Sequence, residues 1–531
     1  MARTSFRPAR ILCLLTGVAL TTGLVSAVTP HLTPKAAAAL VTSDARAGEL
    51  VNHRTRTSMT IRKSDGTLQT ILSAGALHYW TAGGWKRIDN ELVAADEAGY
   101  AYRNKANAFR AQFKDALDGE YLQVSSAGRD FGLSLEGAGR PAAKAAANNV
   151  VYPHALGNVD LRYDVVADGV KETLVLPDAS SPSTYHFLLS ASGNAAFRAE
   201  RRPDGSWAFY SGVGLAPVFV LDAPVASDAG EAGQPSAATG RNATLDVKKV
   251  GHGFALTLDL DRSWLKAAER RFPVRLDPTI TINPPVEDTS FAATCSNCTP
   301  YVSDKIYVGT DSANAWRGAL QFDLGGIPAG ADVTSASLEA YWQPLCLSAG
   351  SGFCNGTSHQ IDAHLMTKSW TTTSTSGALG FTTTPFASAT VSPAAVGTSP
   401  SWVSWPITST LRSWQAAASP NFGVLLKRAA EPLNASGPVF YGRRNSDPAL
   451  APRLVVTYPG DGVNLLPPDT LHSNGADLRW TPYPSDATTP FTGYEVHRST
   501  VASFMPNAST RLTTVTDRAV TGFRDTTAAA G

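Results

Sequence analysis

Short stretches in which apolar and polar residues alternate make up most of the chain, and turn residues separate them. In residues 159–176, Leu161 and Tyr163 alternate with polar neighbours before a turn at Asp168, and a second strand-like stretch follows at once. A period of two residues is typical of strands, and the Asp-Gly pair favours a tight hairpin. Three more hairpins are predicted in the same way, at residues 76–89, 121–135 and 199–210.

One short helix is predicted in this part of the chain, with Ser263 as the cap of residues 264–271. Strands and turns account for the rest. We therefore predict that residues 40–280 form an antiparallel β domain, a sandwich of two sheets.

Residues 281–460 show the same alternation and predict a second, jelly-roll-like β domain. One of its strands carries Glu339 and Tyr341 between small and apolar positions. Another carries Asp362 and His364 in the same way. Since a half-buried strand presents its polar set to water, all four side chains are expected on solvent-facing sheet surfaces.

Three tryptophans lie within fourteen residues of this second domain. Strand alternation places Trp405 in the core and Trp402 on the opposite face. From Thr408 the pattern has the period of a helix, with Thr408 or Ser409 as the cap, and this period puts Trp414 on the buried side. Only Trp402 is therefore expected outside the core.

The last segment, residues 461–531, predicts a small β-sandwich with Trp480 and Tyr494 pointing inward from adjacent strands. The chain stops before such a sandwich is complete, so open sheet edges are expected. All three segments are rich in strands, and the fold class predicted for the whole chain is all-β.

Residues 1–39 have the three parts of an export signal: an arginine-rich start, an apolar run and an alanine-rich stretch near Ala38 and Ala39. An uncleaved membrane anchor is the competing interpretation, but Thr and Gly interrupt the run. We expect this segment to be removed, outside any domain, and the mature protein to be secreted without a membrane span.

Without residues 1–39 the chain carries 41 basic and 44 acidic side chains. Because no positive charge dominates, a nucleic-acid partner is not expected. Four cysteines remain, and in an exported protein they predict two disulfides with three possible pairings. A zinc site at the first pair is the alternative. The four are Cys295, Cys298, Cys346 and Cys354.

The stretches WRGALQFDLGGIPAGADVTSASLEAYW, WVSWPITSTLRSW, PNFGVLLKR and APRLVVTY give residues 286–458 a resemblance to the DNRLRE domain, also grouped as the family-96 carbohydrate-binding module. Residues 57–280 resemble the β-rich region that precedes this domain in secreted, wall-associated or Rhs-type bacterial proteins, through GGWKRIDNEL and RRFPVRLDPT. The last segment resembles a truncated fibronectin type III domain. The resemblance implies carbohydrate or cell-wall association outside the cell, without catalysis.

The sequence contains no metalloprotease, serine-hydrolase, phosphate-loop or dinucleotide motif. We therefore expect no enzyme activity and no cofactor, although paired carboxylates that meet only in the fold leave a polysaccharide-degrading enzyme as an alternative. A structural calcium ion held by Asp288 and Asp304 is a possibility without a defined ligand set.

Sugar binding needs an aromatic face and a few polar groups. The outward set that could supply them is Trp402, Tyr341, Glu339, Asp362 and His364, and the competing interpretation is that these are ordinary exposed strand residues. A polysaccharide or cell-wall glycan is the expected partner. A second hypothesis is a structural stalk or delivery scaffold for a C-terminal repeat or effector region.

Overall fold

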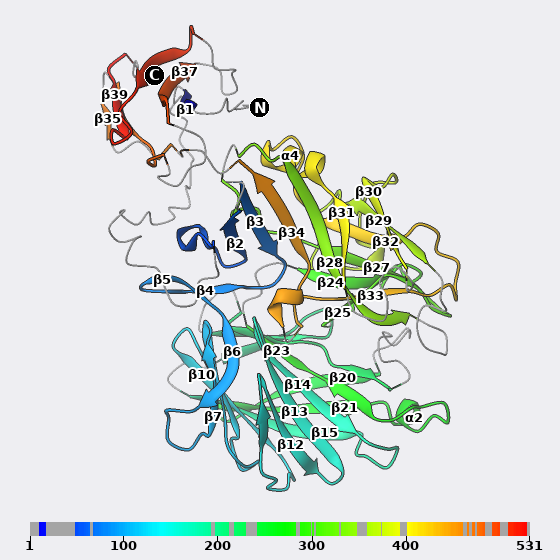
Figure 1. Cartoon of the computed structure of the whole chain (residues 1–531). Helices are drawn as coiled ribbons and strands as arrows, with labels where there is room; N and C mark the ends of the chain where they lie inside the picture. The colour runs from blue at the N-terminus through cyan, green and yellow to red at the C-terminus, as the bar shows by residue number, and fades with distance from the viewer. Residues whose placement is uncertain are drawn as a thin grey trace.

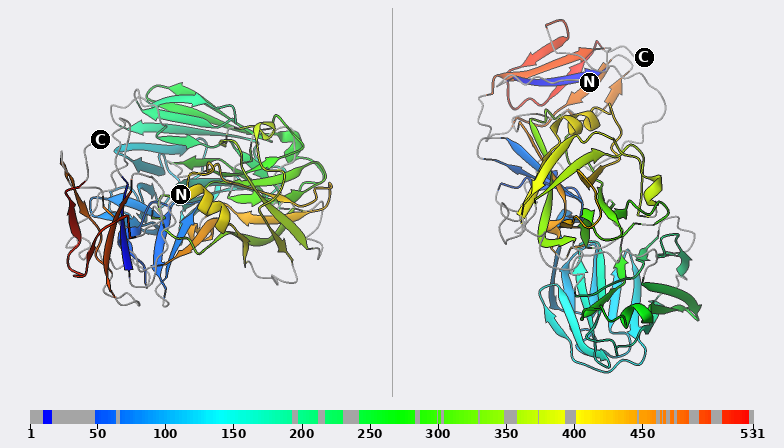
Figure 2. Two further views of the ribbon diagram at one scale, coloured as in Figure 1. Left: turned by 90° about the horizontal axis from the view of Figure 1, so that it is seen from above. Right: turned by 90° about the vertical axis from the view of Figure 1, so that its right-hand side faces the viewer.

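The computed structural model describes residues 10–16 and 48–527, apart from 64–66, 193–196, 212–216, 230–241, 283–286, 299, 302–303, 329–330, 348–357, 373, 393–400, 446, 460–462, 464, 467–469, 473–474, 484–490 and 500–507. Within these residues the strands form three groups, which we call units A, B and C. In Figures 1 and 2, unit A runs from blue through cyan to green, unit B from green through yellow to orange with β2 and β3 in dark blue, and unit C is orange to red with β1 in blue.

Unit A, residues 89–282, is a sandwich of two antiparallel sheets. The first sheet has the order β20 (Ala243–Val250), β21 (Gly253–Leu260), β15 (Thr184–Ser192), β10 (Arg129–Leu135), β9 (Leu122–Ser126), β8 (Phe109–Phe113), β7 (Tyr102–Ala106) and β6 (Asp89–Ala94). The second has the order β11 (Lys144–Ala146), β12 (Asn149–Leu156), β13 (Val159–Val166), β14 (Gly169–Leu176), β23 (Thr279–Thr281), β18 (Phe219–Leu221), β17 (Trp207–Ser211) and β16 (Phe197–Arg201), with β19 (Val225–Ser227) and β22 (Val274–Asp277) beside it.

The hairpins predicted in this region are present. Strands β13 and β14 pair through the turn that contains Asp168, β9 pairs with β10 and β16 pairs with β17. The alternating residues Leu161, Tyr163 and Val165 are fully buried in one core between the two sheets. The fourth hairpin, β4 (His78–Thr81) with β5 (Gly84–Arg87), stands apart as a sheet of two strands.

Unit B is a second sandwich, formed by residues 48–74 and 287–459. Its larger sheet has the order β2 (Ser58–Arg62), β3 (Leu68–Ser73), β34 (Arg453–Tyr458), β28 (Ser335–Leu347), β33 (Gly437–Tyr441) and β25 (Lys305–Tyr307), and β31 (Ser401–Pro406) pairs with β28. Its smaller sheet has the order β24 (Asp288–Ala292), β27 (Ala315–Leu320), β32 (Val424–Arg428), β29 (His359–Leu365) and β30 (Ala387–Val391), and β26 (Gly309–Thr310) pairs with β27.

The boundary between the first two units differs from the one predicted at residue 280. Figure 1 shows β2 and β3 beside β34, and the register runs from Leu68 opposite Tyr458 to Ser73 opposite Arg453. Leu72 lies in the core of unit B. Unit A is therefore inserted into unit B, because the chain leaves unit B after β3 and returns at β24.

The three tryptophans of residues 401–414 lie as predicted. Trp405 has no exposed surface and donates its indole N–H to the carbonyl of Ile361 at 2.9 Å. Trp414 is buried on helix α4 (Thr408–Gln415), and Trp402 is only partly buried. Two of the three rings are therefore part of the core.

Both predicted helix caps are wrong. In α2 (Arg262–Leu265), the Asp261 carboxylate accepts the first N–H groups, so Ser263 lies inside a single helical turn. A carboxylate is a stronger acceptor than a hydroxyl at this position. In α4 the Thr408 hydroxyl accepts the backbone N–H of Ala336 at 2.9 Å instead of capping. The remaining helical turns are η1 (Val51–His53), η2 (Ser376–Ala378) and η3 (Pro448–Leu450).

Unit C, formed within residues 463–527 and by residues 10–16, has two sheets of three strands around a core that contains Trp480 and Tyr494. The sheets are β35 (Thr470–His472), β36 (Gly475–Arg479) and β39 (Gly522–Asp525), and β1 (Arg10–Thr16), β37 (Gly493–Ser499) and β38 (Arg511–Val515). The two rings lie 5.3 Å apart on different sheets rather than on adjacent strands.

Strand β1 corrects the expectation that residues 1–39 lie outside any fold. It pairs in parallel with β37, from Arg10 opposite Gly493 to Thr16 opposite Ser499. An open sheet edge offers unpaired N–H and C=O groups, and an extended apolar segment can pair with them. Whether export removes this segment stays a prediction.

The predicted all-β sandwich fold is confirmed. Apart from β1 with β37, every strand pair among the described residues is antiparallel. No helix in the described part of the chain is long and apolar enough to cross a membrane.

Candidate functional site

Three aromatic side chains form a row across the outer face of the larger sheet of unit B. Trp402 on β31 lies opposite Tyr341 on β28, and their ring centroids are 5.1 Å apart in an edge-to-face arrangement. Tyr341 stacks on Tyr441 of β33 at 5.9 Å, and Tyr441 lies opposite Lys305 of β25. We call Trp402, Tyr341 and Tyr441 the aromatic row.

A charged pair crosses the aromatic row. The guanidinium of Arg453 lies 3.7 Å from the centre of the Trp402 ring, which covers one face of the indole. The same guanidinium bonds the Glu339 carboxylate at 2.8 and 2.9 Å. Strand alternation alone had suggested a freely exposed Trp402. The contact with Arg453 instead holds its ring in place.

Three of the five predicted site residues, Trp402, Tyr341 and Glu339, meet on this surface. Sequence reasoning missed Tyr441 and Arg453. Their positions follow from β28, which pairs with β33 along one part of its length and with β34 along another. No local pattern shows that Arg453 lies beside Glu339, since 114 residues separate them.

Asp362 and His364 do not belong to this surface, and the prediction that they face solvent is wrong. Both lie on β29 of the smaller sheet and are buried, with 8% and 4% of their surface exposed. The Asp362 carboxylate accepts the Ser388 hydroxyl at 2.6 Å, and Nδ1 of His364 lies 2.6 Å from the carbonyl oxygen of Thr382. They form internal polar contacts.

The first pair of cysteines forms a disulfide. Cys295 and Cys298 are bonded, with their Cα atoms 5.4 Å apart, which excludes the zinc alternative for this pair. Cys346 is in β28, but its side chain and the whole of Cys354 lie outside the described residues. A bond between those two stays a prediction.

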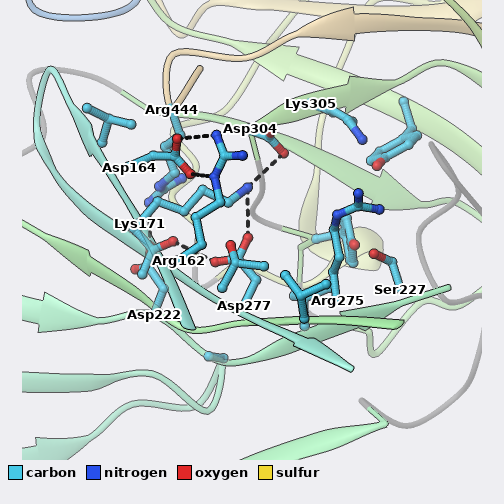
Figure 3. Close-up of a pocket in the computed structure, with 18 of the residues that line it drawn as sticks. Arg162, Asp164, Lys171, Asp222, Ser227, Arg275, Asp277, Asp304, Lys305 and Arg444 are labelled. Atoms are coloured by element: carbon cyan, nitrogen blue, oxygen red, sulfur yellow. Dashed lines mark hydrogen bonds and ion pairs between the residues drawn. The ribbon is translucent and has the colours of Figure 1, made fainter. Parts of the chain in front are cut away.

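Many charged side chains line a pocket where units A and B meet (Figure 3). A pocket of about 330 Å³ is lined by β13, β14, β19 and β22 of unit A and by residues around β25 of unit B. Lys171 of unit A bonds Asp277 at 2.8 Å and Asp304 of unit B at 3.3 Å. Arg444 of unit B bonds Asp222 of unit A at 3.2 Å.

Beside this pocket, the fully buried guanidinium of Arg443 pairs with Asp168 of unit A and with Asp288 of unit B. Asp288 also accepts the Arg443 backbone N–H at 2.6 Å. The oxygens of Asp288 and Asp304 are therefore paired with cationic side chains, which argues against the structural calcium site. No group of three or more metal-binding side chains occurs in the described part of the chain.

Burial shifts several pKa values at this junction. It raises the pKa of Asp288 to about 7, against the opposing effect of Arg444. It also raises the pKa of Glu172 to about 8, although the Tyr163 hydroxyl donates to that carboxylate. For Lys171, burial lowers the pKa, but Asp277 and Asp304 outweigh it and the net shift is upward. These charges hold two sheets together, and some of them lie close to one end of the aromatic row, since Arg443 follows Tyr441 by two residues and Asp304 precedes Lys305, which pairs with Tyr441.

No family model matches the chain. A stretch of 142 residues, 26% of the chain, is 30% identical to the tRNA nuclease WapA of Bacillus subtilis (strain 168). The same identity and coverage apply to the tRNA(Glu)-specific nuclease WapA of Bacillus subtilis subsp. natto and the tRNA3(Ser)-specific nuclease WapA of Bacillus spizizenii. The match spans 6% of each relative, so the chain is similar to one segment of much longer proteins.

Proposed function

We propose that unit B is a non-catalytic carbohydrate-binding module of a secreted, wall-associated bacterial protein, and that the aromatic row is its binding surface. The observation that carries this proposal is the alignment of Trp402, Tyr341 and Tyr441 across three neighbouring strands. Rings in such a row present apolar surface to sugar rings, while Glu339 and Arg453 offer bonding partners for hydroxyl groups.

The dimensions of the surface favour a chain of sugars over a single ring. Together with Lys305 on β25, the aromatic row extends over four strands, a span of about 14 Å at the usual strand spacing. The resemblance to the DNRLRE domain and the export signal support the same proposal. Under this proposal the protein lies outside the cell and does not bind nucleic acid.

Retention of the full chain on a panel of insoluble and soluble polysaccharides tests the proposal. The full chain is required because a fragment of residues 281–460 lacks β2 and β3 of its own sheet. We expect Trp402→Ala to reduce retention at least tenfold with an unchanged melting temperature. Trp80→Ala is the matched control, since Trp80 is 51% exposed on the separate β4–β5 hairpin.

Two results would contradict the proposal: no retention of the wild type on any polysaccharide, or equal losses for both variants. Release of reducing ends above the blank by the wild type would instead favour the alternative of a polysaccharide-degrading enzyme.

A second candidate function, a rigid scaffold within a longer protein, is favoured by the insertion of unit A into unit B. Two chain connections and the buried pair of Arg443 with Asp168 join these units. Because buried ion pairs are screened little by salt, the radius of gyration should stay constant between 0.1 and 1 M NaCl. Small-angle scattering measures it, and an increase with salt would contradict the scaffold.

A further inference from the structure

One end of the aromatic row leads to the pocket between units A and B. Lys305 lies opposite Tyr441 of the row, and it also lines the pocket (Figure 3). Burial raises the pKa of Tyr441, and the carboxylate of Asp304, another residue of the pocket wall, adds to this shift. The row and the pocket are therefore adjacent.

A sugar chain that lies along the row meets unit A beyond β25. This strand is the edge of the larger sheet, and Figure 1 shows it next to unit A. Past β25 the pocket wall consists of side chains from β13, β14, β19 and β22 of unit A. Because unit A stands across the line of the row, the pocket lies where a bound sugar chain would end.

The lining of the pocket carries balanced charge. It contains five carboxylates and five cationic side chains, so no surplus of either sign attracts an ion. The carboxylates are Asp164, Asp222, Asp228, Asp277 and Asp304, and the cations are Arg162, Lys171, Arg275, Lys305 and Arg444. Such a lining favours a neutral ligand with several hydroxyl groups.

The pocket supplies acceptors, donors and aromatic surface. Asp277 and Asp304 share the single ammonium of Lys171, at 2.8 and 3.3 Å, so their carboxylates keep capacity to accept hydrogen bonds from hydroxyl groups. Arg275 is exposed on β22 and supplies N–H donors. Tyr301 is only partly buried and lines the same pocket, where its ring offers apolar surface to a sugar.

We propose that this pocket binds the terminal sugar of a neutral polysaccharide whose preceding sugars lie on the aromatic row. The inference rests on the proposed function and adds that the module recognises chain ends. A volume of about 330 Å³ is within the range of pockets that hold small molecules. The row alone binds any stretch of chain, whereas the row and the pocket together bind a stretch that includes an end more tightly.

Ser227→Trp tests the pocket without removing a charge. Ser227 lies on β19 opposite Arg275 and lines the pocket, so an indole there fills space that a sugar would occupy. Ser125→Trp is the matched control, since Ser125 is partly exposed on β9 in the other sheet of unit A. Arg275→Gln is a second pocket variant, which removes a donor from an exposed position.

Isothermal titration calorimetry of the full chain with cellohexaose, chitohexaose and maltohexaose measures the binding of short chains. We expect at least one hexasaccharide to bind the wild type. Ser227→Trp and Trp402→Ala should each weaken this binding at least tenfold, and Arg275→Gln should weaken it a few-fold. Ser125→Trp should leave it unchanged.

A second measurement compares retention on cellulose, chitin and starch before and after these are shortened by partial acid hydrolysis. Shortening creates chain ends at constant mass. It should therefore increase the amount of bound wild-type protein severalfold and the amount of bound Ser227→Trp protein much less.

The inference is overturned, and the proposed function stands, if Ser227→Trp binds the hexasaccharide as tightly as Ser125→Trp does while Trp402→Ala binds it weakly. It is likewise overturned if none of the three hexasaccharides binds the wild type, or if shortening increases retention of Ser227→Trp and wild type equally. No retention of the wild type on any polysaccharide overturns both proposals. If Ser227→Trp melts at a lower temperature than the wild type, Arg275→Gln decides, and full affinity of that variant overturns the inference.

Discussion

The two outer faces of unit B carry the same alternation in sequence but meet different surroundings. On the larger sheet, the outward residues Glu339 and Tyr341 stay partly exposed. On the smaller sheet, the outward residues Asp362 and His364 are buried, and His364 packs against Phe381 of a second small core that includes Met366 and Trp370. Alternation shows which face a residue is on, whereas exposure depends on what another segment places over that face.

The covered face should depend far more on its aromatic residue than the open face does. Trp370 is buried and donates its indole N–H to the Phe422 carbonyl at 2.9 Å. We expect Trp370→Ala to lower the free energy of unfolding by about 3–5 kcal/mol, as for other buried aromatic residues. Tyr341→Ala should cost about 1 kcal/mol. Urea unfolding measures both, and equal losses would remove the distinction between the faces.

The buried carboxylate should matter next. Asp362 accepts hydrogen bonds from Ser388 at 2.6 Å and from Gln360 at 3.0 Å. Asp362→Ala leaves these donors without their acceptor, and we expect a loss of about 1–3 kcal/mol in urea unfolding. Asp362→Asn, which keeps an acceptor, should recover part of the loss. An unchanged midpoint for the alanine variant would mean that the covering segment opens readily to water.

The covered face should also respond to pH through His364. Burial lowers the pKa of His364 below 6.5, although the Thr382 carbonyl opposes this shift. The unfolded chain then binds the proton more readily, so stability is lost as the pH falls below about 6.5. His364→Gln should remove this part of the pH dependence, by no more than about 1 kcal/mol. Urea unfolding of both proteins at pH 7.5 and 5.5 measures this effect. An equal change in the free energy of unfolding between the two pH values for both proteins would contradict the prediction.

The smallest change in stability is expected on the open face. Glu339 and Arg453 form a partly exposed ion pair at 2.8 Å, and such pairs contribute about 0.5 kcal/mol. Glu339→Gln should therefore barely affect unfolding, while it lowers polysaccharide retention a few-fold by loosening Arg453 above Trp402. A large loss of stability with unchanged retention would assign this pair a structural role.

Local features of the fold could be predicted from the sequence because local rules decide them. The hairpin of β13 and β14 and the burial of Trp405 follow from turn residues and strand period, but the two turn residues are Ala167 and Asp168, and Gly169 already pairs with Val166 in β14. The predicted cap at Ser263 was wrong because Asp261, two residues earlier, offers a carboxylate, which is the stronger acceptor. The position of a hairpin and the face of a strand residue are thus easier to predict from sequence than the exact end of an element.

Contacts between distant segments could not be predicted in the same way. The hairpin of β2 and β3 has a pattern that fits either sandwich, and only the pairing of β3 with β34 decides that it belongs to unit B. Arg453 and Tyr441 joined the candidate surface through the same long-range pairing. The pocket near Lys171 combines residues of two units, so no single motif could have indicated it.

The insertion of unit A has a consequence for the order in which the protein is made and folded. The Thr70 hydroxyl lies 2.8 Å from the Tyr458 hydroxyl, and 388 residues separate them. At about 5–20 residues per second, synthesis of that interval takes roughly 20 to 80 s. Limited proteolysis of a chain that ends before Arg453 should therefore cut the early hairpin. Until β34 has been synthesised, β3 has an unpaired edge, so β2 and β3 are made early but are among the last strands to reach their final neighbours.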